Sequence, residues 1–169
     1  MIRYGRVATV DLAAGTCTVE CGDVTTQGVR WQERAAGHTR TWSPPSDGEQ
    51  VVLLCPDGDV AGAFALRGVT QDAHPLPGTT LAECVLFSDG TRISYDPEAH
   101  ALSIAAGTGT VSIIATGGIS ITGDVAIDGN MTLTGTIEAD GDITGAGVSL
   151  EHHTHGGVQS GGAETDEPS

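Results

Sequence analysis

The sequence predicts an all-β protein, in which a small Greek-key barrel is followed by an intertwined trimeric β-helix with the form of a triangular prism. Residues 1–75 consist of short runs in which apolar and polar residues alternate, separated by Gly and Asp turns. From residue 110 to 147 the alternation continues around a glycine at every sixth position. A period of two residues indicates extended chain, and a fixed repeat indicates an array of one small unit. The six glycines are Gly117, Gly123, Gly129, Gly135, Gly141 and Gly147.

Residues 1–75 are predicted to form the first domain. Five or six short strands with tight turns are typical of a Greek-key barrel of the oligonucleotide/oligosaccharide-binding (OB) type. Pro44 and Pro45 exclude helix from the segment before the fourth strand. We expect this barrel to act as a docking module. The candidate strands cover residues 6–11, 16–20, 24–33, 49–56 and 61–69.

The charge balance excludes several classes of function. The chain has 22 acidic residues against seven arginines and no lysine, and residues 93–169 contain no Lys or Arg. Binding to nucleic acid or to an anionic membrane surface requires clustered cations. No signal peptide and no apolar run of membrane-spanning length is visible, so we expect a soluble protein made in the cytoplasm. The four cysteines lack zinc-site spacing and are expected to be reduced thiols.

Residues 76–109 are predicted to form a linker and the start of the β-helix. Two prolines and a glycine between Asp72 and Gly78 indicate a stiff, irregular joint. Short alternating runs follow at 83–88, 91–95 and 101–105, and Ser88-Asp89-Gly90 is a hairpin turn. His100 is expected to be an exposed turn residue.

Residues 110–150 form the repeat, which is too long for one strand and must bend at its glycines. Two architectures use six-residue β units. The single-chain coil of hexapeptide acyltransferases would leave open strand edges after so few repeats. An intertwined trimer closes those edges, and identical copies readily bury a thin stripe that contains no aromatic residue. The sequence therefore favours a stiff three-chain prism, a mechanical element with no cleft.

Residues 151–169 are predicted to form an apex that begins with a histidine cluster. In extended chain His153 and His155 project to one side, while His152 and Thr154 face the other. Two imidazoles from each of three chains provide six nitrogens, and an octahedral set of this kind suits iron or nickel better than zinc. A solvated histidine tail is the alternative interpretation.

The chain resembles the baseplate spike proteins of contractile phage tails, the V-protein type also found in R-type pyocins. The apical motifs are His153-Thr154-His155, Gly156-Gly157 and Thr165-Asp166-Glu167-Pro168. Motifs in the N-terminal half are Trp42-Ser43-Pro44-Pro45, Gly48-Glu49-Gln50-Val51 and Pro56-Asp57-Gly58-Asp59. The similarity extends over essentially the whole chain.

This resemblance implies a non-enzymatic homotrimer that pierces the outer membrane of a target cell. The OB domains would dock to the baseplate hub protein, and the prism would transmit force to a pointed apex. One iron ion on the trimer axis would be held by His153 and His155 of three chains, in an octahedron of six histidine nitrogens. The protein would lie at the baseplate tip of a virion or pyocin particle, after assembly in the host bacterial cytoplasm.

Two alternatives from other classes remain open from the residues. A hexapeptide-type acyltransferase would need a histidine base beside a coenzyme A pocket. A trimeric adhesin or tail-fibre fragment would need surface aromatic residues for sugar stacking, and residues 96–169 contain none.

Overall fold

The computed structural model describes residues 1–157 and 161, and the chain divides into two compact units at Ile114 and Ala115. Within the described residues the regular structure is all β, apart from one 3-10 turn at Pro56–Gly58. None of the helical segments there is long and apolar enough to cross a membrane. Gly162 and the motif at residues 165–168 lie outside the described residues. The predicted all-β class is confirmed.

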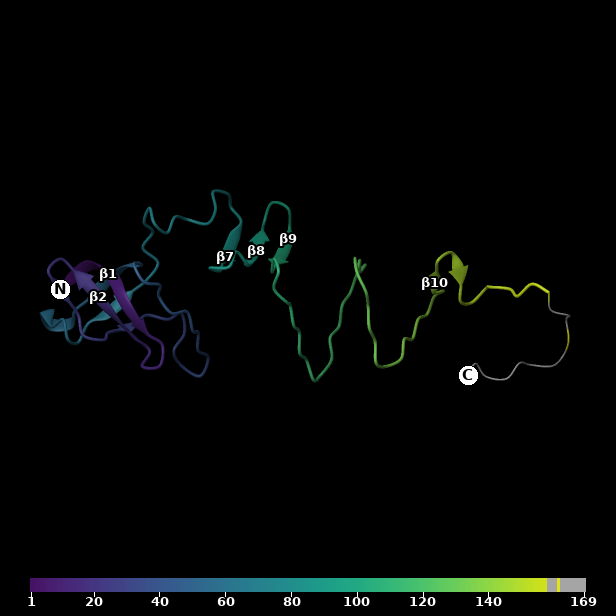
Figure 1. Cartoon of the computed structure of the whole chain (residues 1–169), viewed down its shortest axis with the longest axis horizontal. Helices are drawn as coiled ribbons and strands as arrows, with labels where there is room; N and C mark the ends of the chain where they lie inside the picture. Colours follow the sequence, from purple (N-terminus) through teal and green to yellow (C-terminus); the bar gives the residue numbers. More distant parts are fainter. Residues whose placement is uncertain (158–160, 162–169) are drawn as a thin grey trace. The chain divides into compact units, whose positions relative to one another are not determined.

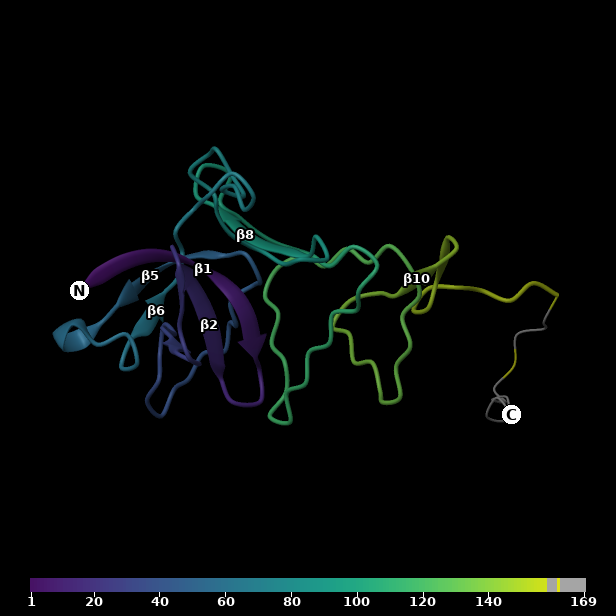
Figure 2. The ribbon, with the colours of Figure 1, turned by 60° about the vertical axis from the view of Figure 1, so that its left-hand side comes forward.

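The N-terminal domain is a six-stranded sheet in the order β3-β2-β1-β5-β6-β4, shown from two directions in Figures 1 and 2. Two backbone hydrogen bonds between Cys17 of β2 and Val29, both 2.8 Å, connect the second strand of this order to the residue just before β4, the last strand. This closure turns the sheet into a barrel. The strands are β1 (Ile2–Asp11), β2 (Thr16–Cys21), β3 (Val24–Thr25), β4 (Arg30–Trp31), β5 (Gln50–Leu54) and β6 (Phe64–Leu66).

The predicted strand over residues 24–33 is wrong as one element, because the chain bends between β3 and β4. At the bend the buried hydroxyl of Thr26 accepts a hydrogen bond from the Val19 amide at 2.9 Å. The Thr26 amide donates to the Val19 carbonyl, also at 2.9 Å. Gly28 then passes so close to Thr16 that a Cβ at this position would lie 2.9 Å from its hydroxyl. A side-chain hydroxyl therefore replaces one backbone acceptor and breaks the strand.

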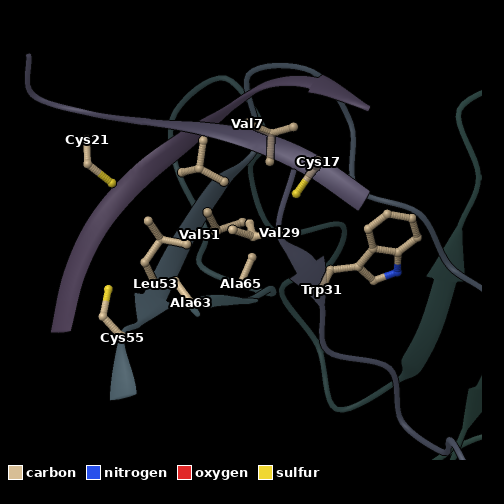
Figure 3. Packing of buried hydrophobic residues seen from close by; sticks show 11 residues of the cluster. Val7, Cys17, Cys21, Val29, Trp31, Val51, Leu53, Cys55, Ala63 and Ala65 are labelled. Atoms are coloured by element: carbon tan, nitrogen blue, oxygen red, sulfur yellow. The ribbon is translucent and has the colours of Figure 1, made fainter. Parts of the chain in front are cut away.

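Apart from Trp31, the barrel core is built from small and medium-sized side chains, as Figure 3 shows. Alternate residues of β5 point inward, so that Val51 and Leu53 are fully buried. Three cysteines are buried and free, and burial raises the pKa of the Cys17 and Cys21 thiols. All four cysteines are free thiols, in line with the expected reduced state, and the three buried ones pack as small apolar residues. The buried set comprises Val7, Cys17, Val19, Cys21, Val29, Trp31, Val51, Leu53, Cys55, Ala63 and Ala65.

The loop after β4 is held to the barrel by the carboxylate of Glu33. This carboxylate accepts hydrogen bonds from Trp31 Nε1 at 2.9 Å, from the Thr41 hydroxyl at 2.7 Å and from the Ser43 amide at 2.7 Å. Burial alone would raise the pKa of Glu33, but these hydrogen bonds outweigh it and hold the pKa below its usual value. Arg67 adds a bond to the Ser43 carbonyl. The Pro-rich segment is therefore an ordered loop and not a strand.

A second antiparallel sheet contains β7 (Glu83–Leu86), β8 (Arg92–Asp96) and β9 (Ala101–Ala105), close to the predicted ranges. Asp89 forms the turn between β7 and β8 by accepting the Thr91 amide at 2.9 Å. His100 lies exposed in the next turn with φ of 53°. The register places the larger apolar side chains on one face, and all of them are exposed in a single chain. These residues are Val85, Ile93, Tyr95, Leu102 and Ile104.

The hexad region forms no strand within one chain, and Figure 1 draws it without arrows between β9 and β10. The aliphatic side chains that we expect to be buried at the centre of the three-chain prism are exposed in one chain, including Ile113, Ile121 and Ile137. Strand structure requires a neighbouring strand to pair with the backbone amides and carbonyls. The strands predicted for each hexad therefore need partners that one chain does not supply.

Replacement of Gly5 by alanine should destabilise the barrel. A Cβ at this position would lie 2.5 Å from Val19 Cγ1 and 2.6 Å from Cys21 Sγ, so the neighbouring strand must shift. Overpacking of this kind costs about 1–3 kcal/mol. Both tryptophans, Trp31 and Trp42, lie in this domain, so denaturant unfolding followed by tryptophan fluorescence measures its stability.

Gly37→Ala is the matched control, because a Cβ there meets no atom within 4 Å. Equal unfolding midpoints for the two variants would contradict the packing argument.

Candidate metal centre

A short hairpin precedes the histidine cluster and consists of β10 (Thr144–Gly145) and β11 (Val148–Ser149). Ala146 and Gly147 form its turn with φ of 51° and 83°. Positive φ at both central residues is typical of the type I′ turns that join antiparallel strands. Gly147, the last of the six regularly spaced glycines, is therefore a turn residue. The chain reverses direction here, at a place that the sequence pattern assigns to the repeat.

Asp142 connects the two ends of this hairpin. Its Oδ1 accepts the Glu151 amide at 3.1 Å, and its Oδ2 accepts the Thr144 hydroxyl at 3.3 Å. The Leu150 amide donates to the Ile143 carbonyl at 2.9 Å. The hydrogen bond from Glu151, followed by one from the Ser149 side chain, lowers the pKa of Asp142. A charged carboxylate thus fixes the residues immediately before the histidines.

The ring of His153 is oriented by backbone carbonyls. Its Nδ1 lies 3.1 Å from the carbonyl oxygen of Ser149 and 3.1 Å from that of Leu150. Carbonyl oxygens only accept hydrogen bonds, so this geometry requires the proton on Nδ1. Nε2 then keeps its lone pair, which is the arrangement that metal-binding histidines adopt in proteins.

The structure brings the predicted pair together and sets His152 apart. The rings of His153 and His155 have centroids 5.0 Å apart, with their planes at 73°. The His152 ring lies instead beside Glu151, with Nε2 3.7 Å from the carboxylate, and its backbone amide donates to Ser149 Oγ at 2.8 Å. All three histidines are exposed.

The donors present fit a first-row transition metal. Two neighbouring imidazoles, one with its Nδ1 proton already engaged, are ligands that iron, nickel and zinc accept. Within residues 1–157 and 161, no group of three or more His, Cys, Asp or Glu side chains is placed to hold an ion. A complete coordination sphere would therefore need donors from further copies of the chain.

Sequence reasoning missed Asp142 and Ser149 as part of this site. In the sequence, Asp142 falls on a polar position of the alternating repeat, and the pattern gives Ser149 no particular role. The available signal was the Gly145-Ala146-Gly147 run, since closely spaced glycines mark turns and a turn there brings these two residues together.

Comparisons with known protein families agree with this arrangement along the chain. Residues 3–69 match the Type VI secretion system/phage-baseplate injector OB domain. Residues 83–151 match the Gp138 beta-helical trimerization domain, and residues 147–169 match the GpV apex motif. An injector OB barrel, a trimerising β-helix and an apex, in this order, define a baseplate spike of a contractile tail, and the chain belongs to this family.

A curated relative supports the same conclusion. The chain is 39% identical to the spike protein of Escherichia phage P2 over 123 residues, which are 72% of this chain and 58% of the relative. The matched part thus spans little more than half the length of that relative. The OB-type barrel, the trimeric β-helix and the family resemblance predicted from the sequence are confirmed. The acyltransferase and adhesin alternatives are not favoured.

Proposed function

We propose that the protein is the homotrimeric, membrane-piercing spike at the centre of a contractile phage-tail or pyocin baseplate. This proposal rests on the aliphatic stripe, which is the set of exposed aliphatic side chains in the repeat of residues 110–147. The stripe lies within the residues that match the trimerisation domain, and the paired histidines follow it in the sequence. Sheath contraction would drive the trimer through the outer membrane of the target cell. The role is mechanical and not enzymatic. The protein would be assembled in the host cytoplasm and carried at the baseplate tip of the particle.

The stripe supports association of three copies. Ile121 is 70% exposed in one chain, and the aliphatic residues at equivalent positions of the other hexads are similarly exposed. Burial of such a side chain contributes about 1.5–3 kcal/mol. Three chains wound around one axis bury the stripe and pair every backbone edge, so no open edge remains. The apolar face of β7, β8 and β9 belongs to the same trimerisation match and would extend the buried region.

Ile121→Asp should prevent trimer formation, whereas Thr122→Asp should not. The first variant places three carboxylates in the apolar core, where unpaired charges cost several kcal/mol each. The second places the same charge on the adjacent, outward position. Light scattering on the purified proteins measures the mass directly. Two variants of equal mass would contradict the proposal that Ile121 faces the trimer axis and Thr122 faces outward.

The outer face of the barrel offers a surface for docking to the baseplate hub. The register aligns Ile2, Leu54 and Phe64 in one row across β1, β5 and β6, and aligns Tyr4, Val52 and Leu66 in the next. Ile2 and Tyr4 are 71% and 69% exposed. A contiguous apolar patch of this kind marks a protein interface. The hub is the expected partner, because the domain match is to a phage-baseplate injector module.

Replacement of both Ile2 and Tyr4 by serine should weaken binding to the hub protein of the same particle at least tenfold. Aromatic and large aliphatic anchors dominate interface energies, and two lost anchors remove about 2 kcal/mol or more. Calorimetric titration of the trimer with purified hub measures the affinity. Leu12→Ser is the matched control, since Leu12 is exposed but lies in the β1–β2 turn. Unchanged affinity in the double variant would exclude this patch.

The paired histidines would close the tip. His153 and His155 of three chains would hold one iron ion on the axis, through six imidazole nitrogens in an octahedron. The ion would act as a cross-link between three chain ends that would otherwise splay under load. Because no single chain offers the full site, metal binding and association would stabilise each other.

His153→Ala combined with His155→Ala should remove the metal and leave the trimer intact. The aliphatic stripe holds the chains together without the ion, so only the tip changes. Elemental analysis should give one iron per trimer for the native protein and none for the double variant. His152→Ala is the control and should retain the metal, because the His152 ring faces Glu151. A double variant with a full metal complement would refute the ligand assignment.

A further inference from the structure

Hydrogen bonds around the β10–β11 hairpin hold the segment from Ser149 to His153, and Asp142 accepts one of them. We propose that Asp142 and Ser149 are positioning residues for the metal ligand, which hold His153 in the tautomer and orientation that bind metal. The ligand role of His153 is itself the proposal of the preceding subsection, so this inference rests on it. Neither Asp142 nor Ser149 would touch the ion.

The first step is the carboxylate of Asp142. Its Oδ1 accepts the Glu151 amide at 3.1 Å, and its Oδ2 accepts the Thr144 hydroxyl at 3.3 Å. Glu151 follows the hairpin, nine positions after Asp142, whereas Thr144 is the first residue of β10. One exposed carboxylate therefore links the segment that leaves the hairpin to the strand that enters it.

The second step is the hydroxyl of Ser149. Its oxygen accepts the His152 amide at 2.8 Å. Serine hydroxyls that bond to a nearby backbone amide stabilise local turns. This bond closes a turn over residues 149–152, and the same turn presents the carbonyls of Ser149 and Leu150 in one direction.

The third step is the ring of His153. Both carbonyls lie 3.1 Å from Nδ1, and together they fix the plane of the ring and the position of its proton. Free histidine in water has no such restraint, and both tautomers exchange. Carbonyl or carboxylate partners behind a metal-binding histidine commonly change metal affinity by about 10–100-fold when they are removed. Here the partners are backbone carbonyls, and the side chains of Asp142 and Ser149 hold the segment that carries these carbonyls in place.

The arrangement explains why a hairpin stands directly before the apex. The stripe of the repeat needs other chains to become ordered, whereas the bonds from Asp142 to His153 lie within one chain. Each subunit would thus bring a correctly oriented Nε2 to the axis. The donor atoms are set locally, and association only has to bring three copies of them together.

Asp142→Ala tests the proposal in the full-length trimer, with Asp140→Ala as the matched control. Asp140 is also exposed, but its carboxylate makes no hydrogen bond to the hairpin among the described residues, whereas that of Asp142 does. We expect both variants to remain trimers by light scattering. Against a competing chelator, Asp142→Ala should lose affinity for iron by about 10–100-fold, and Ser149→Ala by a similar factor. The double variant should lose no more than either single variant, because both residues act by fixing the same turn before His153.

A second measurement separates positioning from metal binding. Selective ¹⁵N labelling of histidine in the metal-free trimer reports the tautomer of each ring, and His153→Ala assigns the signal. We expect the Nδ1-protonated form at His153 in the native protein and in Asp140→Ala, and a mixture in Asp142→Ala. Asp142→Asn should be intermediate, since its amide keeps one acceptor oxygen for Glu151 but loses the second acceptor.

The outcomes are distinguishable. If the native protein binds no iron but the tautomer still responds to Asp142, the positioning role stands and the proposed metal centre fails. If Asp142→Ala retains both the native tautomer and the native iron affinity, the positioning role is overturned while the metal centre survives.

Discussion

The backbone and the aliphatic stripe of the repeat cannot be satisfied within one chain, and the rest of the molecule depends on this constraint. Two aliphatic side chains per six residues are exposed there, and the backbone has no strand partner among the described residues of a single copy. The barrel, by contrast, closes on itself through Cys17 and Val29. The barrel therefore folds alone, whereas the hexad repeat between β9 and β10 needs association to pair its backbone, as expected for a domain of the trimerisation type.

The sequence predicted the barrel well because its signals are local. Alternation and Asp-Gly turns marked most strands to within a few residues, including the second sheet at residues 83–105. The break between β3 and β4 was missed, because it depends on the Thr26 hydroxyl replacing a backbone acceptor across the sheet. The loop of residues 34–46 likewise depends on Glu33, whose partners lie up to ten residues away. Such contacts follow from the fold and not from periodicity.

The candidate site was predictable in part. Spacing alone pairs His153 with His155, and the structure also turns the His152 ring toward Glu151. The proton position on His153 was not predictable, because it depends on two carbonyls presented by a turn. Asp142 fits the polar phase of the hexads, so its pattern gave no sign of a separate role. The hairpin was not predicted, because Gly147 keeps the six-residue spacing of the repeat. In the structure, however, it adopts a positive φ in a tight turn.

The regular spacing of the glycines has a consequence for assembly. A chain displaced by six residues against its neighbours would still align glycine with glycine and aliphatic with aliphatic, so the repeat by itself tolerates sliding between the chains. Alignment must come from the parts that do not repeat. The β7–β9 sheet fixes one boundary of the periodic stretch and the β10–β11 hairpin fixes the other. A slipped trimer would leave one apical hairpin out of step with the other two, so three unequal chain ends could not meet in one point.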